Sequence, residues 1–405
     1  MISKIAVFTI TSALHDKDAI DKASKEFLGS LNINYTLHDD NFATYGEAPL
    51  CLIYVRTGGA EGIFKALLPQ LLQQAPGAPF YLLTSGQSNS LAASIEILAY
   101  LEQQGLRGEI LHGNPQYIAR RIDLLTQVEE ARKNLRGLKL GVIGKPSDWL
   151  IASQVDYDAL LPHGIQIVDI EMAELLDAFA ATQCSAPQQL LDEAPEGAIR
   201  DSVPDAWRIY HALKQLVQRH GLRGLTLRCF DLLTAVHNTG CLALAQLNAE
   251  GITASCEGDI PALISMAIVH ALTGVAGFQA NPSRINVETG ELTFAHCTIP
   301  FNMVQRHELH THFESGIGVA IRGFMPTGPV TLFKASAALD RHFAAQGQLV
   351  ENLALPNLCR TQQVIMLDDA TQASYFLRHP IGNHHIIVPG HRKQALDALM
   401  SIFKS

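Results

Sequence analysis

The chain has 405 residues, 47% hydrophobic and 17% charged, so it is long enough for two or three domains with sizeable cores and lacks the composition of a disordered protein. Its formal net charge of -9 comes without a long run of lysine or arginine, which argues against a nucleic-acid partner or an anionic membrane. The seven cysteines are scattered and lack CxxC spacing, which favours a reduced cytoplasmic protein with small-molecule ligands.

The first third of the chain alternates short apolar runs with helical stretches. Strands are predicted for KIAVFTI at 4–10, LCLIYVRTGG at 50–59 and FYLLTSG at 80–86, and helices near 61–74, 90–104 and 116–135. The first run is too short to be the core of a signal peptide, and no stretch reaches the roughly 18 apolar residues of a membrane span. This alternation predicts a parallel sheet with crossover helices, so residues 1–135 form the expected N-terminal α/β domain.

A second α/β domain is expected over residues 136–224. The apolar run LKLGVIG at 138–144 predicts its first strand. Gly141 and Gly144 lack the third glycine and the following acidic residue of a dinucleotide fingerprint, so NAD binding is not indicated. The proline-containing stretch 182–205 predicts a loop or a segment at the edge of a domain, before a helix over about 205–219.

Residues 225–405 form the expected catalytic region. The segment 253–274 predicts a strand end that leads into a helix, and a further helix is expected over 237–250. After Phe278, many short apolar runs separated by glycine, proline and asparagine predict a mostly antiparallel barrel or sandwich. The predicted fold class is therefore α/β, with two N-terminal parallel-sheet, Rossmann-like domains followed by an α+β C-terminal domain that contains a β-barrel-like region.

The richest polar cluster is Cys256-Glu257-Gly258-Asp259, at the predicted strand-to-helix junction. A carboxylate beside the flexible Gly258 can face a cleft, and Asp259 is expected to cap the helix. Farther along the chain, more candidate ligands stand near strand ends: Asn281, His296, His384 and His385. Oxygen and imidazole ligands from distant segments suit Mn²⁺, Mg²⁺ or a related ion, although a hydrogen-bonded structural role is the alternative for each histidine.

Two further segments could line a cleft. In HTHFESGIG, the side chains of His310, His312 and Glu314 would face one side of a strand, forming either a polar cleft wall or a solvated edge. Arg360, close to Gln362, offers a guanidinium that could hold an anionic group of a substrate, and a salt bridge within the β region is the alternative.

The run from about 226 to 390 resembles the C-terminal half of the L-fucose and L-arabinose isomerase family, and the upstream alternation is similar to that family's two N-terminal α/β domains. The most specific piece is SCEGDIPALISMAIVHALTG, which matches the family's glutamate-containing motif at the start of a helix. The resemblance implies that Glu257 is a metal ligand and proton-transfer group and that His296 and His384 are ligands, with His385 as the alternative to His384. Segments such as ANPS, HFESG and LCRTQ are similar to those of an uncharacterised subgroup.

One position departs from the family pattern. Fucose isomerases have an aspartate ligand where this chain has Asn281. An asparagine can coordinate a metal through its amide oxygen but cannot accept a proton. Asp231 and Glu314 are the available substitutes for the missing acid, and either could instead have only a structural role.

The resemblance implies a divalent-metal-dependent aldose–ketose isomerase that acts through a metal-stabilised enediol on a sugar or a modified, including anionic, sugar. Mn²⁺ is the preferred ion, with Mg²⁺ or Co²⁺ as alternatives. Arg360, His312 and Gln362 are expected to bind the substrate, and the protein is expected to be a homo-oligomer, a hexamer or a trimer. The alternatives are a relative that binds a carbohydrate without isomerising it and a lyase or epimerase that uses the same site.

Overall fold

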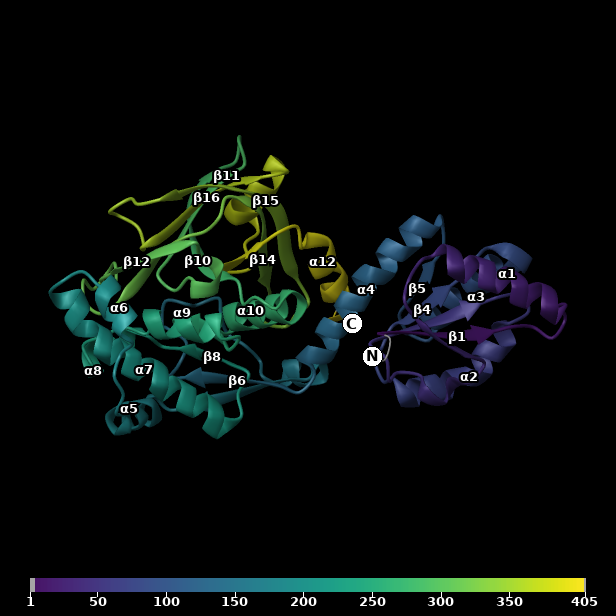
Figure 1. The fold of residues 1–405 in the computed structure, drawn as a ribbon, viewed down its shortest axis with the longest axis horizontal. Coiled ribbons are helices and arrows are strands. Elements are labelled where there is room, and N and C mark those ends of the chain that lie inside the picture. Colours follow the sequence, from purple (N-terminus) through teal and green to yellow (C-terminus); the bar gives the residue numbers. More distant parts are fainter. Residues whose placement is uncertain (1–3, 404–405) are drawn as a thin grey trace. The chain divides into compact units, whose positions relative to one another are not determined.

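The computed structural model describes residues 4–403 and comprises two compact units, residues 1–133 and 134–405 (Figure 1). Within the described residues, every helix is too short or too polar to cross a membrane. Isolated turns of 3₁₀ helix occur at Phe42–Thr44, Gln87–Asn89, Asp158–His163, Phe301–Met303 and Ala370–Ser374. Each unit contains a parallel sheet, as the alternation of strands and helices predicts.

The first unit is a five-stranded parallel sheet in the order β2-β1-β3-β4-β5. Its strands are β1 (Ile5–Ile10), β2 (Thr36–Asp39), β3 (Leu50–Val55), β4 (Phe80–Leu83) and β5 (Gly108–Leu111), and its helices are α1 (Lys17–Ser30), α2 (Glu61–Gln74), α3 (Ser90–Gln103) and α4 (Pro115–Leu135). Helices α2 and α3 pack on one face, and α1 and α4 on the other. The central strands β1, β3 and β4 are buried throughout, which explains why they are continuously apolar.

The second unit begins with a four-stranded parallel sheet in the order β7-β6-β8-β9. Its strands are β6 (Leu138–Ile143), β7 (Ile165–Ile170), β8 (Gly224–Leu227) and β9 (Thr253–Cys256), and its helices are α5 (Met172–Ala181), α6 (Gln188–Glu193), α7 (Ala198–His220), α8 (Phe230–Ala235), α9 (Cys241–Ala249) and α10 (Ile260–Thr273). The sheet therefore contains strands from both of the expected regions, 136–224 and 225–405.

The prediction of a loop over 182–205 was wrong. Helix α6 lies inside this stretch, and α7 begins at Ala198, so that Pro204 is within its second turn. Val203 and Ala206 are buried in the core beside Pro204, and this packing outweighs the hydrogen bond that the proline cannot donate.

Six strands of the second unit form a closed antiparallel barrel in the order β10-β11-β16-β15-β14-β17, which confirms the expected antiparallel region. They are β10 (Phe278–Asn286), β11 (Glu291–His296), β14 (Gly328–Ala335), β15 (His342–Leu353), β16 (Thr361–Leu367) and β17 (His385–Pro389). The strands β12 (Arg306–His310) and β13 (Ala320–Phe324) pair separately, and the last helices are α11 (Tyr375–Arg378) and α12 (Lys393–Phe403).

Helix α10 joins the two sheets of the second unit (Figure 1). It contacts β8 and β9 of the parallel sheet and β14 and β17 of the barrel. Every residue from Ile260 to Val269 is buried, as expected for a helix that is apolar on all sides. The start of α10 therefore lies where the parallel sheet meets the barrel.

Candidate metal centre

The turn between β9 and α10 holds Glu257 in an unusual backbone conformation. Glu257 has a φ of +65°, which costs a residue with a side chain about 1–3 kcal/mol and persists only where the surroundings impose it. The carbonyl oxygen of Glu257 accepts a hydrogen bond from the Ser147 N–H at 2.9 Å, and the Gly258 N–H donates to the Leu227 carbonyl at 3.0 Å. A Cβ atom on Gly258 would lie 2.5 Å from the carbonyl oxygen of Lys145, so only glycine fits there.

Three side chains from distant segments converge above this turn. The Nε2 atom of His296 lies 3.7 Å from Oε1 of Glu257, and the Nε2 atom of His384 lies 3.5 Å from the same oxygen. His296 is the last residue of β11, and His384 directly precedes β17. One ligand atom from each residue can be chosen so that all lie within 4.8 Å of one another, a spacing suited to a single metal ion.

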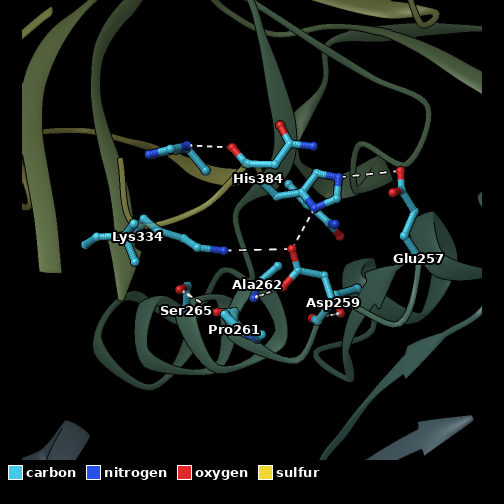
Figure 2. Close-up of polar contacts among 12 residues, drawn as sticks. Glu257, Asp259, Pro261, Ala262, Ser265, Lys334 and His384 are labelled. Carbon is cyan, nitrogen blue, oxygen red and sulfur yellow. Dashed lines mark hydrogen bonds and ion pairs between the residues drawn. The ribbon is translucent and has the colours of Figure 1, made fainter. Parts of the chain in front are cut away.

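The orientation of His384 follows from its partner. Its Nδ1 atom lies 2.7 Å from Oδ2 of Asp259, and both side chains are fully buried (Figure 2). Since a carboxylate accepts, Nδ1 donates, and Nε2 is directed toward Glu257 without a hydrogen-bond partner among the described residues. The other oxygen of Asp259 accepts from the Ala262 N–H at 2.8 Å, so the predicted helix cap is confirmed.

His385 lies outside this cluster. Its Nδ1 atom lies 2.9 Å from the carbonyl oxygen of Asn383, and its Nε2 atom lies 3.1 Å from the hydroxyl of Tyr375. Because a carbonyl oxygen only accepts, Nδ1 of His385 donates and Nε2 accepts. Of the two adjacent histidines, only His384 therefore presents a free ring nitrogen to Glu257.

The charges at this centre reinforce one another. Burial alone would raise the pKa of Glu257, but His296 and His384 lower it far below its usual range. Burial would likewise lower the pKa of His384, but Asp259 and Glu257 raise it to about 9. The pKa of Asp259 falls to about 2 despite burial, because Lys334 and His384 are close. The two ionised carboxylates make the surroundings of His384 favourable for a cation.

Asn281 and Gln279 lie two residues apart on β10, so their side chains point to the same side. The Gln279 amide brackets the end of β9: its oxygen accepts from the Cys256 N–H at 2.7 Å, and its NH₂ group donates to the Cys256 carbonyl at 3.4 Å. The Asn281 side chain therefore lies on the same face of β10 as that of Gln279, and its Oδ1 atom is buried with no hydrogen-bond partner among residues 4–403.

The donor set fits a divalent metal ion. Glu257 supplies a carboxylate, His296 and His384 supply imidazole nitrogens, and Asn281 offers an amide oxygen. Two of these buried atoms, Nε2 of His384 and Oδ1 of Asn281, lack the partner that a buried polar atom normally has. Mixed oxygen and imidazole ligands are typical of divalent metal sites, whereas structural zinc sites usually contain cysteine ligands.

Trp149 is a functional candidate that the sequence analysis missed. Its indole N–H donates to Oε2 of Glu257 at 2.7 Å, its side chain is 51% exposed, and Phe230 packs edge-on against it at 4.8 Å. The signal in the sequence was its place in the loop after β6, because ligands of parallel sheets bind beyond the carboxyl ends of strands.

The predicted strand through HTHFESGIG was wrong beyond His310, where β12 ends. Nε2 of His310 lies 3.3 Å from Glu308, whereas Nδ1 of His312 lies 3.0 Å from the Ser315 hydroxyl in the following turn. The two glycines of this segment, at positions 316 and 318, both have positive φ and favour the turn over a strand. Burial and the charge of His296 lower the pKa of His312 to about 4, so its ring is neutral at neutral pH.

The two candidate acids differ in their surroundings. Asp231, in the first turn of α8, forms an ion pair with Arg228 at 3.1 Å. Glu314 lies in the turn after β12, where partial desolvation and the negative charge of Glu257 raise its pKa. Glu314 is therefore the candidate whose charge interacts with that of Glu257.

Arg360 and Gln362 have defined partners. Nε of Arg360 donates to the Thr311 carbonyl at 2.7 Å, and Nη2 lies 3.2 Å from the Thr311 hydroxyl, which orients the half-buried guanidinium. Gln362 is buried, and its amide accepts from the Leu355 N–H and donates to the carbonyls of Leu355 and Cys359. These contacts favour a role for Gln362 in ordering the loop that carries Arg360.

No family model matches the chain. A stretch of 241 residues, 56% of this chain, is 25% identical to the sulfoquinovose isomerase of Clostridium sp. (strain MSTE9) and covers 54% of that protein. A stretch of 286 residues, 66% of this chain, is 24% identical to the sulfoquinovose isomerases of Priestia aryabhattai and Priestia megaterium and covers 63% of each. The chain thus spans between about half and less than two thirds of the length of these curated relatives.

Proposed function

We propose that this chain is a divalent-metal-dependent aldose–ketose isomerase that acts on a sugar or a modified sugar. The observation that carries the proposal is the convergence of Glu257, His296 and His384, with Nε2 of His384 buried and unpartnered. The relatives named sulfoquinovose isomerase support a sugar isomerase in general. The narrower resemblance to L-fucose and L-arabinose isomerases stays a prediction, as does the choice of Mn²⁺ over Mg²⁺ or Co²⁺.

In this proposal, four residues hold the metal: Glu257, Asn281, His296 and His384. A bound divalent ion would supply Lewis-acid stabilisation of negative charge on neighbouring substrate oxygens. Asp259 holds His384 in place, and the Trp149 N–H fixes the second oxygen of Glu257. The protein itself therefore orients two of these groups, Glu257 and His384, before any ion binds.

Proton transfer between C1 and C2 of the sugar requires a base and an acid. Glu257 is ionised, because the two histidines lower its pKa, and its carboxylate can take a proton from C2. Glu314 has a raised pKa, so it retains its proton to a higher pH than an ordinary glutamate and can return one to the opposite end of the enediol. Two carboxylates with pKa values shifted apart are typical of an acid and base pair. We propose Glu314, rather than Asp231, as the substitute for the missing acid.

The substrate class follows from the relatives and from Arg360. Sulfoquinovose is a sulfonated sugar, and a guanidinium is well suited to binding a sulfonate. The Arg360 guanidinium donates two hydrogen bonds to Thr311, the residue next to His312, and these bonds orient it. We propose that Arg360 binds an anionic group of the sugar, with His312 in contact with its hydroxyls.

The first test is a titration with Mn²⁺ after treatment with a chelator, for the wild type and for Glu257→Gln. We expect one site in the wild type and a loss of affinity of about 10-fold or more in the variant, because a charged ligand is replaced by a neutral one. Glu291→Gln, which removes an exposed carboxylate at the other end of β11, is the control and should bind as the wild type does.

Activity is tested by incubating the Mn²⁺-loaded protein with aldoses in D₂O, with sulfoquinovose included. Formation of a ketose with deuterium at C1 would support the isomerase. Because Asn281 replaces an aspartate, the second candidate is a protein that binds a carbohydrate without isomerising it. Sugar binding without ketose formation or deuterium exchange would favour this second candidate.

A further inference from the structure

Lys334 is a buried cation beside the candidate metal centre. It belongs to barrel strand β14, its side chain is 1% exposed, and its Nζ atom lies 3.8 Å from Oδ2 of Asp259 (Figure 2). The Nζ atom has no hydrogen-bond partner among the described residues. A buried ammonium is costly, so its retention at this position indicates a function for its charge.

Asp259 joins three structural elements through its two carboxylate oxygens. Oδ1 caps α10 by accepting from the Ala262 N–H, while Oδ2 accepts from Nδ1 of His384 and faces Lys334 on β14. A cap needs only one oxygen, and a serine or asparagine provides it equally well. The second oxygen and its buried lysine are therefore not explained by the start of the helix.

We infer that Asp259 and Lys334 form a buried positioning pair that keeps His384 with its proton on Nδ1 and its Nε2 lone pair directed at the metal. The inference rests on the proposed metal site. A ligating histidine commonly donates its other ring N–H to a carboxylate, which fixes its tautomer and its orientation. Oδ2 of Asp259 lies 2.7 Å from Nδ1 of His384 and 3.8 Å from Nζ of Lys334, so that the imidazole and the ammonium group both face this one acceptor oxygen.

The pair and Glu257 lie at different nitrogens of His384. Asp259, with Lys334 behind it, contacts Nδ1, whereas Glu257 lies 3.5 Å from Nε2 and 3.7 Å from Nε2 of His296. A merely structural pair would fasten α10 to the barrel, as the hydrogen bond from the Ala335 N–H to the Ser265 hydroxyl already does. A positioning pair must in addition change how His384 binds the ion.

The test compares Mn²⁺ binding by the wild type, Asp259→Asn and Lys334→Met. An asparagine can keep the cap through its side-chain oxygen, but it presents an NH₂ group to Nδ1 of His384. Because an NH₂ group donates, Nδ1 then has to accept that hydrogen bond, and the proton of the neutral ring is on Nε2. We expect the affinity for Mn²⁺, measured by calorimetry, to fall about 10- to 100-fold in Asp259→Asn. Lys334→Met should change the affinity in the same direction by a smaller factor.

Pulsed electron paramagnetic resonance of the bound Mn²⁺ gives a second readout, because it detects the nitrogen of each ligating imidazole. We expect the signal of two imidazoles in the wild type and of one in Asp259→Asn. Asp16→Asn is a matched control, since Asp16 caps α1 by accepting from the Ala19 N–H at 2.8 Å and has no histidine partner in the part of the chain that the structure describes. Both the affinity and the nitrogen signals of this control should equal those of the wild type.

The outcomes separate the two proposals. If the wild type binds no Mn²⁺, the proposed metal site is overturned and this inference with it. If the wild type binds Mn²⁺ and Asp259→Asn binds it with equal affinity and two imidazole signals, only the positioning pair is overturned. Should a single variant not fold, the double variant Asp259→Ser with Lys334→Met replaces it, because it keeps a helix cap and removes both buried charges. This double variant should give the signal of one imidazole, and the signal of two would overturn the positioning pair.

Discussion

At the scale of single residues, His384 and His385 are adjacent in the chain but have different hydrogen-bond partners. Adjacent residues of a strand point to opposite sides, so the choice between His384 and His385 depended on a register that one residue could shift. In the structure, the ring of His384 is hydrogen-bonded to Asp259, and the ring of His385 is hydrogen-bonded to Tyr375. The same limit applies to Trp149, since the conformation of the loop after β6 could not be read from the residues alone.

Trp149 offers a test of how Glu257 is held. Trp149→Phe keeps the aromatic contact with Phe230 but removes the N–H donor to Oε2 of Glu257. A hydrogen bond to a charged group contributes about 1.5–3 kcal/mol, less where it is partly exposed. We therefore expect the affinity for Mn²⁺, measured by titration with the ion, to fall about 10-fold. The free energy of unfolding, measured by titration with denaturant, should change little.

The second tryptophan of the chain is the control for this variant. Trp207 lies in α7 and packs against Tyr210, with no contact to Glu257 in the described structure. Trp207→Phe should leave the affinity for Mn²⁺ unchanged. Equal losses in the two variants would mean that the indole of Trp149 has no specific effect on Glu257.

At the scale of elements, hydrophobic periodicity predicted most strands and helices of both sheets. It could not predict which strands pair in the barrel, because β17 pairs with β10 and β14 over long sequence distances. It also missed the early start of α7, where tertiary packing overrides the proline signal. The strand-to-helix junction at Glu257 was predictable, because a short β-rich run is followed directly by a capped apolar helix.

The tight turn at this junction allows a prediction about the stability of the protein when Gly258 is replaced. Gly258→Ala places a methyl group 2.5 Å from the Lys145 carbonyl oxygen in a backbone with φ of +70°. We expect a loss of more than about 2 kcal/mol in the free energy of unfolding, measured with denaturant, from combined strain and overpacking.

Gly274→Ala separates the two causes. Gly274 follows α10, has a φ of +75°, and a Cβ atom there would meet nothing within 4 Å. This variant should lose only about 1 kcal/mol, the backbone contribution. If both variants lose the same amount, the close approach of Lys145 to Gly258 has no energetic weight.

At the scale of the whole molecule, the composition predicted a folded protein, the alternation of strands and helices predicted an α/β fold, and the family resemblance added a homo-oligomer. We propose a trimer or a hexamer, because the isomerases that the chain resembles are oligomers with active sites near subunit boundaries. Light scattering of the purified chain, whose mass is 44.1 kDa, should give three or six times this mass. A monomeric mass at micromolar concentration would contradict the proposal.

The closing strand of the barrel has a consequence for how the protein is made. Strand β17 follows the other five barrel strands in the chain and must insert between β10 and β14. Such long-range pairing forms late, because the loop entropy is lost before the contacts are gained. His384 directly precedes β17, so a growing polypeptide on the ribosome carries Glu257 and His296 for some time before it can complete the cluster.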